Sequence, residues 1–388
     1  MRRAKTRRQS SPQPAPDPPG FEDLRDALDG IDTRIVKLLA ERQTVVAQLG
    51  ALKVEHRIRV FHPDREADIL SRRRAQAERM GLSPDFVEGV IRAVLRQSRM
   101  LQYSVRRKPS RGTPAKVLLV GGRGQMGTFL RKWFEESGHE VRALDQGDWP
   151  RARALCDGLD LALLMVPIEM TERLAARLGP FLPRRCVLAD ITSLKVRPLK
   201  AMLRAHKGPV LGLHPMFGPT PSLDRQVLAV VPARGKAQSQ WVVDQFREWG
   251  AVIVQAKAKE HDELMAFVQA LNHFTAFLFG QFLSRRGPRL TRLLAYASPI
   301  YRLEMIMIGR LFAQNPRLYA EIILADPERC RLLQEFLASV RGNAALLRAR
   351  DKTAFAREFS RIARYFRVFS AQAMRESSYL IEKMTEHF

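Results

Sequence analysis

Residues 116–127 read KVLLVGGRGQMG, and the rest of the chain is best understood from this stretch. Its apolar part, residues 117–120, suits a strand that is buried on both faces. The glycine cluster that follows contains Gly122, Gly124 and Gly127 at the spacing G-x-G-x-x-G. Glycine allows a tight turn and a close approach of the backbone to a pyrophosphate group. The stretch predicts a dinucleotide-binding loop; a glycine-rich turn without a ligand is the alternative for the loop taken alone.

The segment after the glycines continues this pattern. A helix is expected over residues 128–137 with Gly138 as its stop, and its first N–H groups would attract phosphates. A second strand, residues 140–144, ends at Asp145. A carboxylate there can accept hydrogen bonds from both ribose hydroxyls of NAD and repels the 2′-phosphate of NADP. We therefore expect NAD as the cofactor, bound by Gly122, Gly124, Gln125, Met126, Gly127 and Asp145.

Length and composition limit the class of protein. The 388 residues allow two or three domains, and 46% of them are hydrophobic. No apolar run approaches the ~20 residues that a membrane-spanning helix needs. The three cysteines, Cys156, Cys186 and Cys330, lack metal-site spacing and suit a reducing cytoplasm. We expect a cytoplasmic protein without a metal and without membrane association.

The net charge of +25 raises the alternative of a nucleic-acid-binding protein. No RNA- or DNA-binding motif accompanies the charge, and the arginines are spread along the whole chain. A positive field that attracts small polyanionic substrates explains the charge equally well. We expect small-molecule substrates and no nucleic acid.

Hydrophobic spacing divides the chain into regions. Apolar residues at three- and four-residue steps predict helices over residues 21–54, 64–80 and 84–103. Strands alternating with helices are then expected at 161–166, 187–191, 210–213, 227–231 and 252–254. The remainder is helical, with helices expected over 260–283, 288–313, 316–324, 327–350 and 353–388.

These regions predict a multidomain fold of the α and α/β classes. Residues 1–20 are expected to form a disordered basic tail, for which a transit peptide is the less favoured alternative. Residues 106–114 are a basic linker rich in helix breakers. The expected domains are an all-helical one at 21–105, a Rossmann-type one with a mostly parallel sheet at 115–256, and an all-helical one at 257–388. In the last of these, residues 260–283 are apolar nearly all round, which is typical of a helix buried between subunits.

Basic residues interrupt the apolar face of the first helix. Arg42 and Lys53 are about 20° apart around a helix and ~16 Å apart along it, so they could hold opposite ends of one small dianion. Arg25 lies on nearly the same face but ~25 Å from Arg42, too far to serve the same ligand within one subunit. For any single arginine, solvated surface is the simpler interpretation.

Part of this region resembles a known family. The segments Leu24-Arg25, Leu39-Ala40-Glu41-Arg42, Lys53, Arg65-Glu66 and Gln102 are similar to the all-helical chorismate mutases. The resemblance implies a site in which placed charges promote a rearrangement without a nucleophile. His62 stands where some mutases carry an aspartate, so a monofunctional dehydrogenase with a regulatory or dimerising helical domain is the alternative. The implied site residues are Arg42, Lys53, Arg65, Glu66 and Gln102, with Arg25 of the partner subunit.

A second group of candidates follows the expected strands. His214, in GLHPMFG, could accept the proton of an alcohol that is being oxidised. Ser193 and Lys195, in DITSLK, end another strand at the same edge and are expected to face the same crevice. Arg302 and Arg310 lie among apolar neighbours on one expected helix, and a buried arginine needs an anion. A structural carboxylate and a substrate carboxylate are equally good candidates for that anion.

The segments GGRGQMG, VPI, HPMFGP and SPIYRLE resemble the prephenate dehydrogenases. With the mutase-like N-terminus, the chain resembles the bifunctional T-protein family of bacterial tyrosine synthesis. The resemblance implies chorismate and prephenate as substrates, NAD-dependent oxidative decarboxylation to 4-hydroxyphenylpyruvate, feedback inhibition by tyrosine, and a homodimer.

The resemblance also implies roles for dehydrogenase residues. His214 would polarise the ring hydroxyl of prephenate, Ser193 would orient the imidazole, and Arg310 would bind a substrate carboxylate. Lys195, Arg302 and His273 are further candidates for substrate binding, and His273 is associated in the family with the response to tyrosine.

Overall fold

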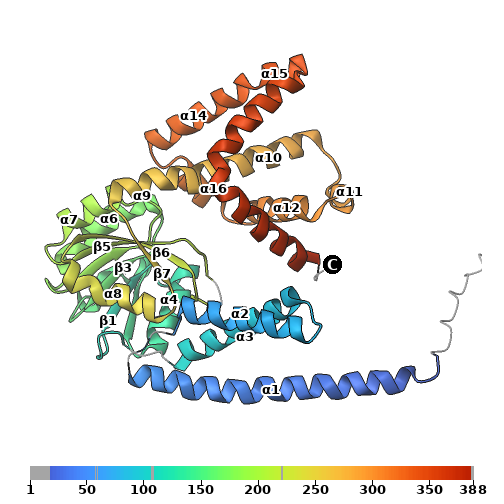
Figure 1. The fold of residues 1–388 in the computed structure, drawn as a ribbon. Helices are drawn as coiled ribbons and strands as arrows, with labels where there is room; N and C mark the ends of the chain where they lie inside the picture. The colour runs from blue at the N-terminus through green and yellow to red at the C-terminus, as the bar shows by residue number, and fades with distance from the viewer. Residues whose placement is uncertain (1–17, 57, 59, 106–108, 220–221, 386–388) are drawn as a thin grey trace, which may run out of the picture. The chain divides into compact units, whose positions relative to one another are not determined.

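The computed structural model describes residues 18–56, 58, 60–105, 109–219 and 222–385. The chain divides into two compact units, residues 1–107 with 248–250, and residues 108–247 with 251–388. Most of the predicted basic tail lies outside the described residues. The second unit contains both the predicted dinucleotide-binding region and the C-terminal helices, which are coloured green to red in Figure 1.

The first unit has the three helices that the sequence predicts: α1 (Phe21–Glu55), α2 (Pro63–Arg79) and α3 (Pro84–Val105). Proline starts α2 and α3, where its missing N–H costs no hydrogen bond. Helix α3 packs against both α1 and α2. The apolar core between them includes Val46, Leu70, Ala77 and Leu95.

The N-terminal half of α1 is not covered by the rest of its unit. Every side chain from residue 21 to residue 41 is exposed, and α1 extends past α2 and α3 in Figure 1. Large apolar side chains such as Leu28 and Leu38 are 59% and 62% exposed. A lone helical segment with such a face has little to stabilise it in water.

A seven-stranded sheet organises the second unit, with strand order β2-β1-β3-β4-β5-β6-β7. The strand pairs are parallel except β5 with β6, so the predicted mostly parallel sheet is confirmed. Strands β1 and β3 are continuous apolar runs because helices cover both faces of the sheet. The strands are β1 (Lys116–Val120), β2 (Glu140–Leu144), β3 (Leu161–Leu164), β4 (Val187–Asp190), β5 (Val210–Pro215), β6 (Val227–Arg234) and β7 (Val252–Gln255).

Two sets of helices cover the sheet. Helices α4 and α8 meet through the rings of Phe134 and Phe246, 6.4 Å apart, while α6 packs against α7. These two pairs lie on opposite faces of the sheet, as Figure 1 shows. The helices are α4 (Gln125–Glu136), α5 (Ala152–Leu155), α6 (Ile168–Leu178), α7 (Val196–Ala205) and α8 (Lys236–Glu248), with short 3₁₀ turns η1 (Gln146–Arg151) and η2 (Gly179–Phe181).

The C-terminal region is helical, as predicted, but more divided. The helix expected over residues 260–283 is interrupted by a π-helical stretch, η3 (Ala266–Leu271). The helix expected over 288–313 breaks where Ser298 caps a new helix that begins at Pro299. The helices are α9 (Ala258–Met265), α10 (Asn272–Arg286), α11 (Leu290–Ala295), α12 (Pro299–Phe312), α13 (Pro316–Ile323), α14 (Pro327–Gly342), α15 (Ala344–Ala349) and α16 (Lys352–Thr385). Among the described helices, none is both long and apolar enough to cross a membrane.

The predicted burial of residues 260–283 is only partly realised within one chain. Met265 and Ala270 are buried, but Phe267, Val268 and Phe282 are more than half exposed. Helix α16 also has no buried residue. These faces need a further surface to cover them.

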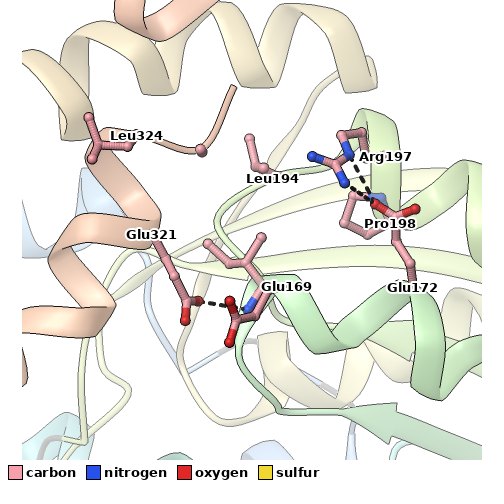
Figure 2. Close-up of a pocket in the computed structure, with 9 residues that line it drawn as sticks. Glu169, Glu172, Leu194, Arg197, Pro198, Glu321 and Leu324 are labelled. Carbon is pink, nitrogen blue, oxygen red and sulfur yellow. Dashed lines mark hydrogen bonds and ion pairs between the residues drawn. The ribbon is translucent and has the colours of Figure 1, made fainter. Parts of the chain in front are cut away.

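The start of α6 is joined to α13 by a hydrogen bond. The backbone N–H of Ile168 donates to Glu321 Oε2 over 3.0 Å. Beside it lies a cavity of about 260 Å³ between α6, α7 and α13, in which Arg197 pairs with Glu172 (Figure 2). This contact ties the dinucleotide-binding region to the C-terminal helices within the second unit.

Candidate active sites

Polar side chains meet inside the helical unit, where an apolar core would be expected. Arg42 on α1 donates to Ser98 Oγ on α3 over 2.5 Å, and that hydroxyl donates to Val94 O. Burial lowers the pKa of Arg42, and Ser98 is only 7% exposed. A half-buried arginine here is ready to bind an anion.

Glu66 on α2 lies in the same unit and is held by Arg99 on α3. One Arg99 nitrogen lies 2.7 and 2.8 Å from the two carboxylate oxygens of Glu66. The Arg99 guanidinium also lies over the ring of Phe61, 5.6 Å from its centre. Sequence reasoning missed Ser98 and Arg99; the available signal was their place beside Gln102 on one face of α3.

Gln102 has an unused hydrogen-bonding atom. Its Nε2 donates to Ser98 O over 3.3 Å, while its buried Oε1 has no hydrogen-bond partner among the described residues. Gly50 on α1 makes room for it, because a Cβ there would lie 3.3 Å from Gln102 Cγ. An unpaired buried oxygen costs ~1–3 kcal/mol, which a ligand's hydrogen bond would recover.

The other predicted mutase residues make further contacts of their own in one chain. Lys53 Nζ donates to Val60 O over 2.9 Å. Arg65 and Arg25 are exposed and form local pairs with Asp68 and Glu22. The structure therefore places Arg42 and Glu66 in contact with α3, the helix that carries Gln102. Arg25 lies on the uncovered half of α1.

The glycine loop has the shape that the sequence predicts. A Cβ on Gly127 would lie 2.5 Å from Gly121 O, and one on Gly122 would lie 2.9 Å from Ala143 Cβ. Gly121, which the motif does not include, has a φ of +85°. Helix α4 begins at Gln125 with no side-chain cap, so its first N–H groups face the loop and suit a phosphate.

Asp145 lies at the end of β2, beside this loop. Its Oδ2 is buried and makes no hydrogen bond to any described residue; the nearest cation is Arg123, whose Nη1 is 3.7 Å away. Arg123 is itself paired with Asp148. A carboxylate oxygen that is free to accept a hydrogen bond at this place fits the ribose hydroxyls of NAD.

A cavity of about 730 Å³ connects the glycine loop to α12. From the loop and α4 it is lined by Arg123, Gln125 and Thr128. Arg310 reaches it from α12, and its guanidinium pairs with no carboxylate of the described residues. The glycine loop, which is predicted to bind the cofactor, and Arg310, which is predicted to bind a substrate carboxylate, therefore border the same cavity.

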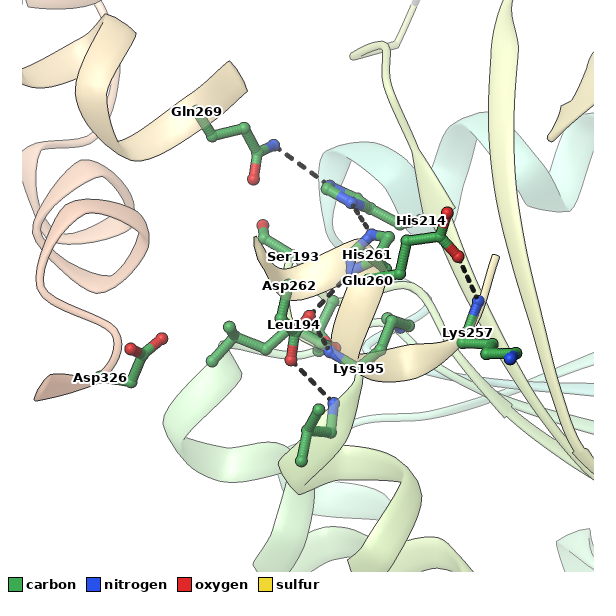
Figure 3. Close-up of polar contacts among 12 residues, drawn as sticks. Ser193, Leu194, Lys195, His214, Lys257, Glu260, His261, Asp262, Gln269 and Asp326 are labelled. Carbon is green, nitrogen blue, oxygen red and sulfur yellow. Dashed lines mark hydrogen bonds and ion pairs between the residues drawn. The ribbon is translucent and has the colours of Figure 1, made fainter. Parts of the chain in front are cut away.

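His214 lies at the end of β5 and is 3% exposed (Figure 3). Its Nδ1 is 2.9 Å from His261 Nε2, and its Nε2 is 3.2 Å from Gln269 Nε2. Burial lowers the pKa of His214 well below its usual value, and the positive charges of Lys195 and Arg329 act in the same direction. The imidazole is therefore neutral at pH 7 and able to accept a proton.

Lys195 is placed differently from the expectation. Its Nζ has no exposed surface; it pairs with Asp190 over 2.5 Å and donates to Leu213 O over 2.7 Å. A buried ammonium that is already paired cannot reach a substrate in the crevice. Because Leu213 precedes His214, Lys195 holds the strand that carries the histidine.

The remaining candidates lie nearby. Ser193 is half-buried, its carbonyl accepts from Arg329 over 3.4 Å, and its hydroxyl makes no hydrogen bond to His214 among the described contacts. His273 packs against Tyr319 with ring centres 5.0 Å apart, and Arg302 is half-buried on α12. Within the described residues, no group of three or more His, Cys, Asp or Glu side chains could hold a metal ion.

Comparison with known proteins assigns these regions. Three family models match: type II chorismate mutase at residues 24–103, the nucleotide-binding domain of prephenate dehydrogenase at 135–255, and its dimerization domain at 257–361. The chain is 41% identical to the T-protein of Enterobacter agglomerans over 364 residues, 94% of this chain and 97% of that protein. The chain belongs to the T-protein family. It is 36% identical to the Haemophilus influenzae T-protein over 367 residues, with the same coverage of 94% and 97%.

Solved structures support the fold of the second unit. A prephenate dehydrogenase from A. aeolicus, in complex with hydroxyphenyl propionate and NAD⁺, matches with a TM-score of 0.53 and 18% identity. The match covers 65% of this chain and 98% of that one. The function rests instead on the family models and the T-proteins, which identify this chain as a bifunctional chorismate mutase and prephenate dehydrogenase of tyrosine biosynthesis.

Proposed function

We propose that the polar cluster of the helical unit catalyses the rearrangement of chorismate to prephenate; this cluster consists of Arg42, Glu66, Ser98, Arg99 and Gln102. We also propose that prephenate is oxidised in the cavity between the glycine loop and α12. The observation that carries the second part is the shared cavity, because it places Arg310 beside the loop that suits NAD. The protein would act in the cytoplasm, whose reducing conditions suit the free cysteines of the described residues.

In the mutase site, cations hold a dianion in a folded conformation. Arg42, Lys53 and Arg65 would bind the carboxylates of chorismate, and Glu66 and Gln102 would face its hydroxyl and ether oxygens. The buried, unpaired Oε1 of Gln102 supports this assignment. Fixed charges around a polarised breaking bond lower the barrier without covalent chemistry.

In the dehydrogenase site, different residues would bind the cofactor, bind prephenate and accept the proton. Gly122, Gly124 and Gly127 would hold the pyrophosphate at the start of α4, and Asp145 would bind the ribose. Arg310 would bind a prephenate carboxylate. His214 would accept the proton of the ring hydroxyl as carbon dioxide leaves and the ring becomes aromatic. When bound, NAD supplies the hydride acceptor.

We propose that the active protein is a homodimer. The uncovered half of α1 and the exposed apolar faces of α10 and α16 support this, as does the match of residues 257–361 to a dimerization domain. If two α1 helices pair antiparallel, Arg25 of the partner subunit comes near Arg42 and Lys53. Each mutase site would then contain residues from two chains.

Tyrosine is the proposed feedback inhibitor. It shares a phenol ring and a carboxylate with the dehydrogenase product, so Arg310 could bind it. His273, on α10 against Tyr319 of α13, is the residue that we assign to this response.

The test supplies chorismate to the purified protein with and without NAD⁺ and identifies the products. Prephenate alone is expected without NAD⁺, and 4-hydroxyphenylpyruvate with it. Replacing chorismate by prephenate separates the two activities. Oxidation of prephenate without any turnover of chorismate would support the monofunctional alternative that His62 suggests.

A further inference from the structure

Three side chains form a continuous hydrogen-bonded series behind the proposed proton acceptor. His214 Nδ1 is 2.9 Å from His261 Nε2, and His261 Nδ1 is 2.8 Å from Asp262 Oδ1. His261 is 2% exposed, so water does not compete for these bonds. Figure 3 shows the three side chains in sequence between Gln269 and the start of α7.

Asp262 fixes the donor and the acceptor of each hydrogen bond in the series. Its Oδ1 accepts from the backbone N–H of Lys195 over 2.8 Å, and its Oδ2 from that of Val196 over 2.9 Å. Burial acts to raise the pKa of Asp262, but hydrogen bonds from His261 and the two N–H groups outweigh it, and the pKa is lowered. Asp262 is therefore an acceptor only.

The proton positions on the two histidines follow from this. His261 Nδ1 must carry a proton to donate to Asp262, which in the neutral ring leaves Nε2 as an acceptor. His214 Nδ1 must then donate to it, and His214 Nε2 carries the lone pair. Asp262 imposes these proton positions from the side of His214 opposite to Gln269.

The charged groups around His214 disfavour its protonated form. Lys195 and Arg329 face His214 from the β4–α7 segment and α14, and each opposes a positive charge on it. Asp190 pairs with Lys195. Of the acidic groups labelled in Figure 3, Asp326 pairs with Arg329, Glu260 accepts from the backbone N–H of Lys257, and Asp262 contacts His261. A protonated His214 can share its charge with Asp262 only along this path.

We infer that His261 and Asp262 are positioning residues of the dehydrogenase, which hold His214 in the tautomer with a free Nε2 and stabilise its protonated form. The inference rests on the proposed role of His214. In the step, the O–H bond of the prephenate hydroxyl breaks and an Nε2–H bond forms on His214. The Nδ1 proton stays on His214 and its hydrogen bond to His261 strengthens; no proton passes to Asp262.

The position of Gln269 also supports a functional site around His214. It lies in the π-helical stretch η3, a rare geometry often found at functional sites, and contacts His214 Nε2. A substrate hydroxyl that binds His214 would take over this contact.

A matched pair of variants tests the inference in the full-length protein. His261→Gln keeps an acceptor near the position of Nε2, whereas His261→Leu removes it. We expect His261→Leu to lower dehydrogenase kcat by roughly 10²- to 10³-fold, and His261→Gln to recover at least a tenth of wild-type activity. Asp262→Asn should resemble His261→Leu, because an amide cannot accept from both backbone N–H groups.

The pH profile provides a readout that a structural role would not move. Without the acceptor, the protonated form of His214 loses a stabilising bond, so the acid limb of kcat/KM in His261→Leu should move to lower pH. Mutase activity and the KM for NAD⁺ should stay within about twofold of wild type, which controls for folding. A His261→Leu enzyme with normal kcat and a normal profile would overturn the inference. If His214→Asn were itself fully active, the proposed role of His214 would fail instead.

Discussion

Arg99 and Glu66 form a nearly buried ion pair between α3 and α2, with one guanidinium nitrogen 2.7 and 2.8 Å from the two carboxylate oxygens. The side chain of Arg99 is 9% exposed and that of Glu66 is 20% exposed. This pair fixes the carboxylate that we assign to the hydroxyl of chorismate. It also places a further cation beside a site for a dianion.

Removing Arg99 should impair the mutase selectively. Arg99→Ala leaves Glu66 without its charged partner, and hydrogen bonds to charged groups contribute ~1.5–3 kcal/mol, so kcat/KM for chorismate should fall roughly ten- to hundredfold. Prephenate oxidation should be unchanged. The matched control is Arg92→Ala, which removes an exposed pair with Glu88 on the same helix and should have little effect. Equal mutase activity of the two variants would remove Arg99 from the site.

Cofactor choice should depend on Asp145. Asp145→Ser removes the charge that repels a 2′-phosphate and leaves Arg123 nearby, so kcat/KM with NADP⁺ should rise relative to NAD⁺. Activity with NAD⁺ should fall roughly ten- to hundredfold, because hydrogen bonds to a charged acceptor are lost. Glu140→Gln, at an exposed position on the same strand, serves as the control. An unchanged ratio of the two kcat/KM values would mean that another residue distinguishes the ribose of NAD⁺ from the 2′-phosphorylated ribose of NADP⁺.

Stability should fall as the pH drops below neutral. Burial lowers the pKa values of His139, His206, His214 and His273 in the folded protein, whereas unfolding restores them to their ordinary values. The unfolded chain then binds more protons, so the stability that is present above pH ~6.5 is lost as the pH falls through and below that value. Thermal unfolding between pH 8 and pH 5 measures this effect. A Tm that is constant or rises over that range would contradict it.

The two-chain mutase site predicts opposite outcomes for two heterodimers. Arg25→Ala and Arg42→Ala should each be inactive alone, but a heterodimer of the two contains one complete site and should show up to half of wild-type activity. A heterodimer of wild type with the Arg25→Ala/Arg42→Ala double variant has no complete site and should be inactive. If each site were built within one chain, the two results would be exchanged.

Much of the second unit could be predicted from the sequence. The strands of its parallel sheet are short apolar runs, and β2 begins and ends where expected, at Glu140 and Leu144. The glycine loop was predictable because steric limits on Gly122 and Gly127 leave no other residue type possible. Such signals are local, so they can be read from neighbouring residues.

Other features depend on contacts between distant segments. The π-helical stretch that contains Gln269 has no distinct pattern, because its residues continue a helical spacing. His261 and Asp262 resemble ordinary surface residues of a helix in sequence, yet His261 is buried against His214 of β5 and Asp262 is held by the N–H groups at the start of α7. Lys195 looked like a substrate ligand, and only the packing of β4 against β5 shows that its ammonium is enclosed.

Lys195 makes contacts at both ends of the His214 series. Its backbone N–H holds Asp262, and its ammonium holds the carbonyl of Leu213, next to His214. A small shift of this residue would therefore move the carboxylate and the base together, and the distances between them would be preserved. Lys195 thus links α9 to β5 beside the hydrogen bonds on which proton transfer to His214 depends. For engineering, Lys195 is the position at which even a charge-conserving change to arginine should be least tolerated.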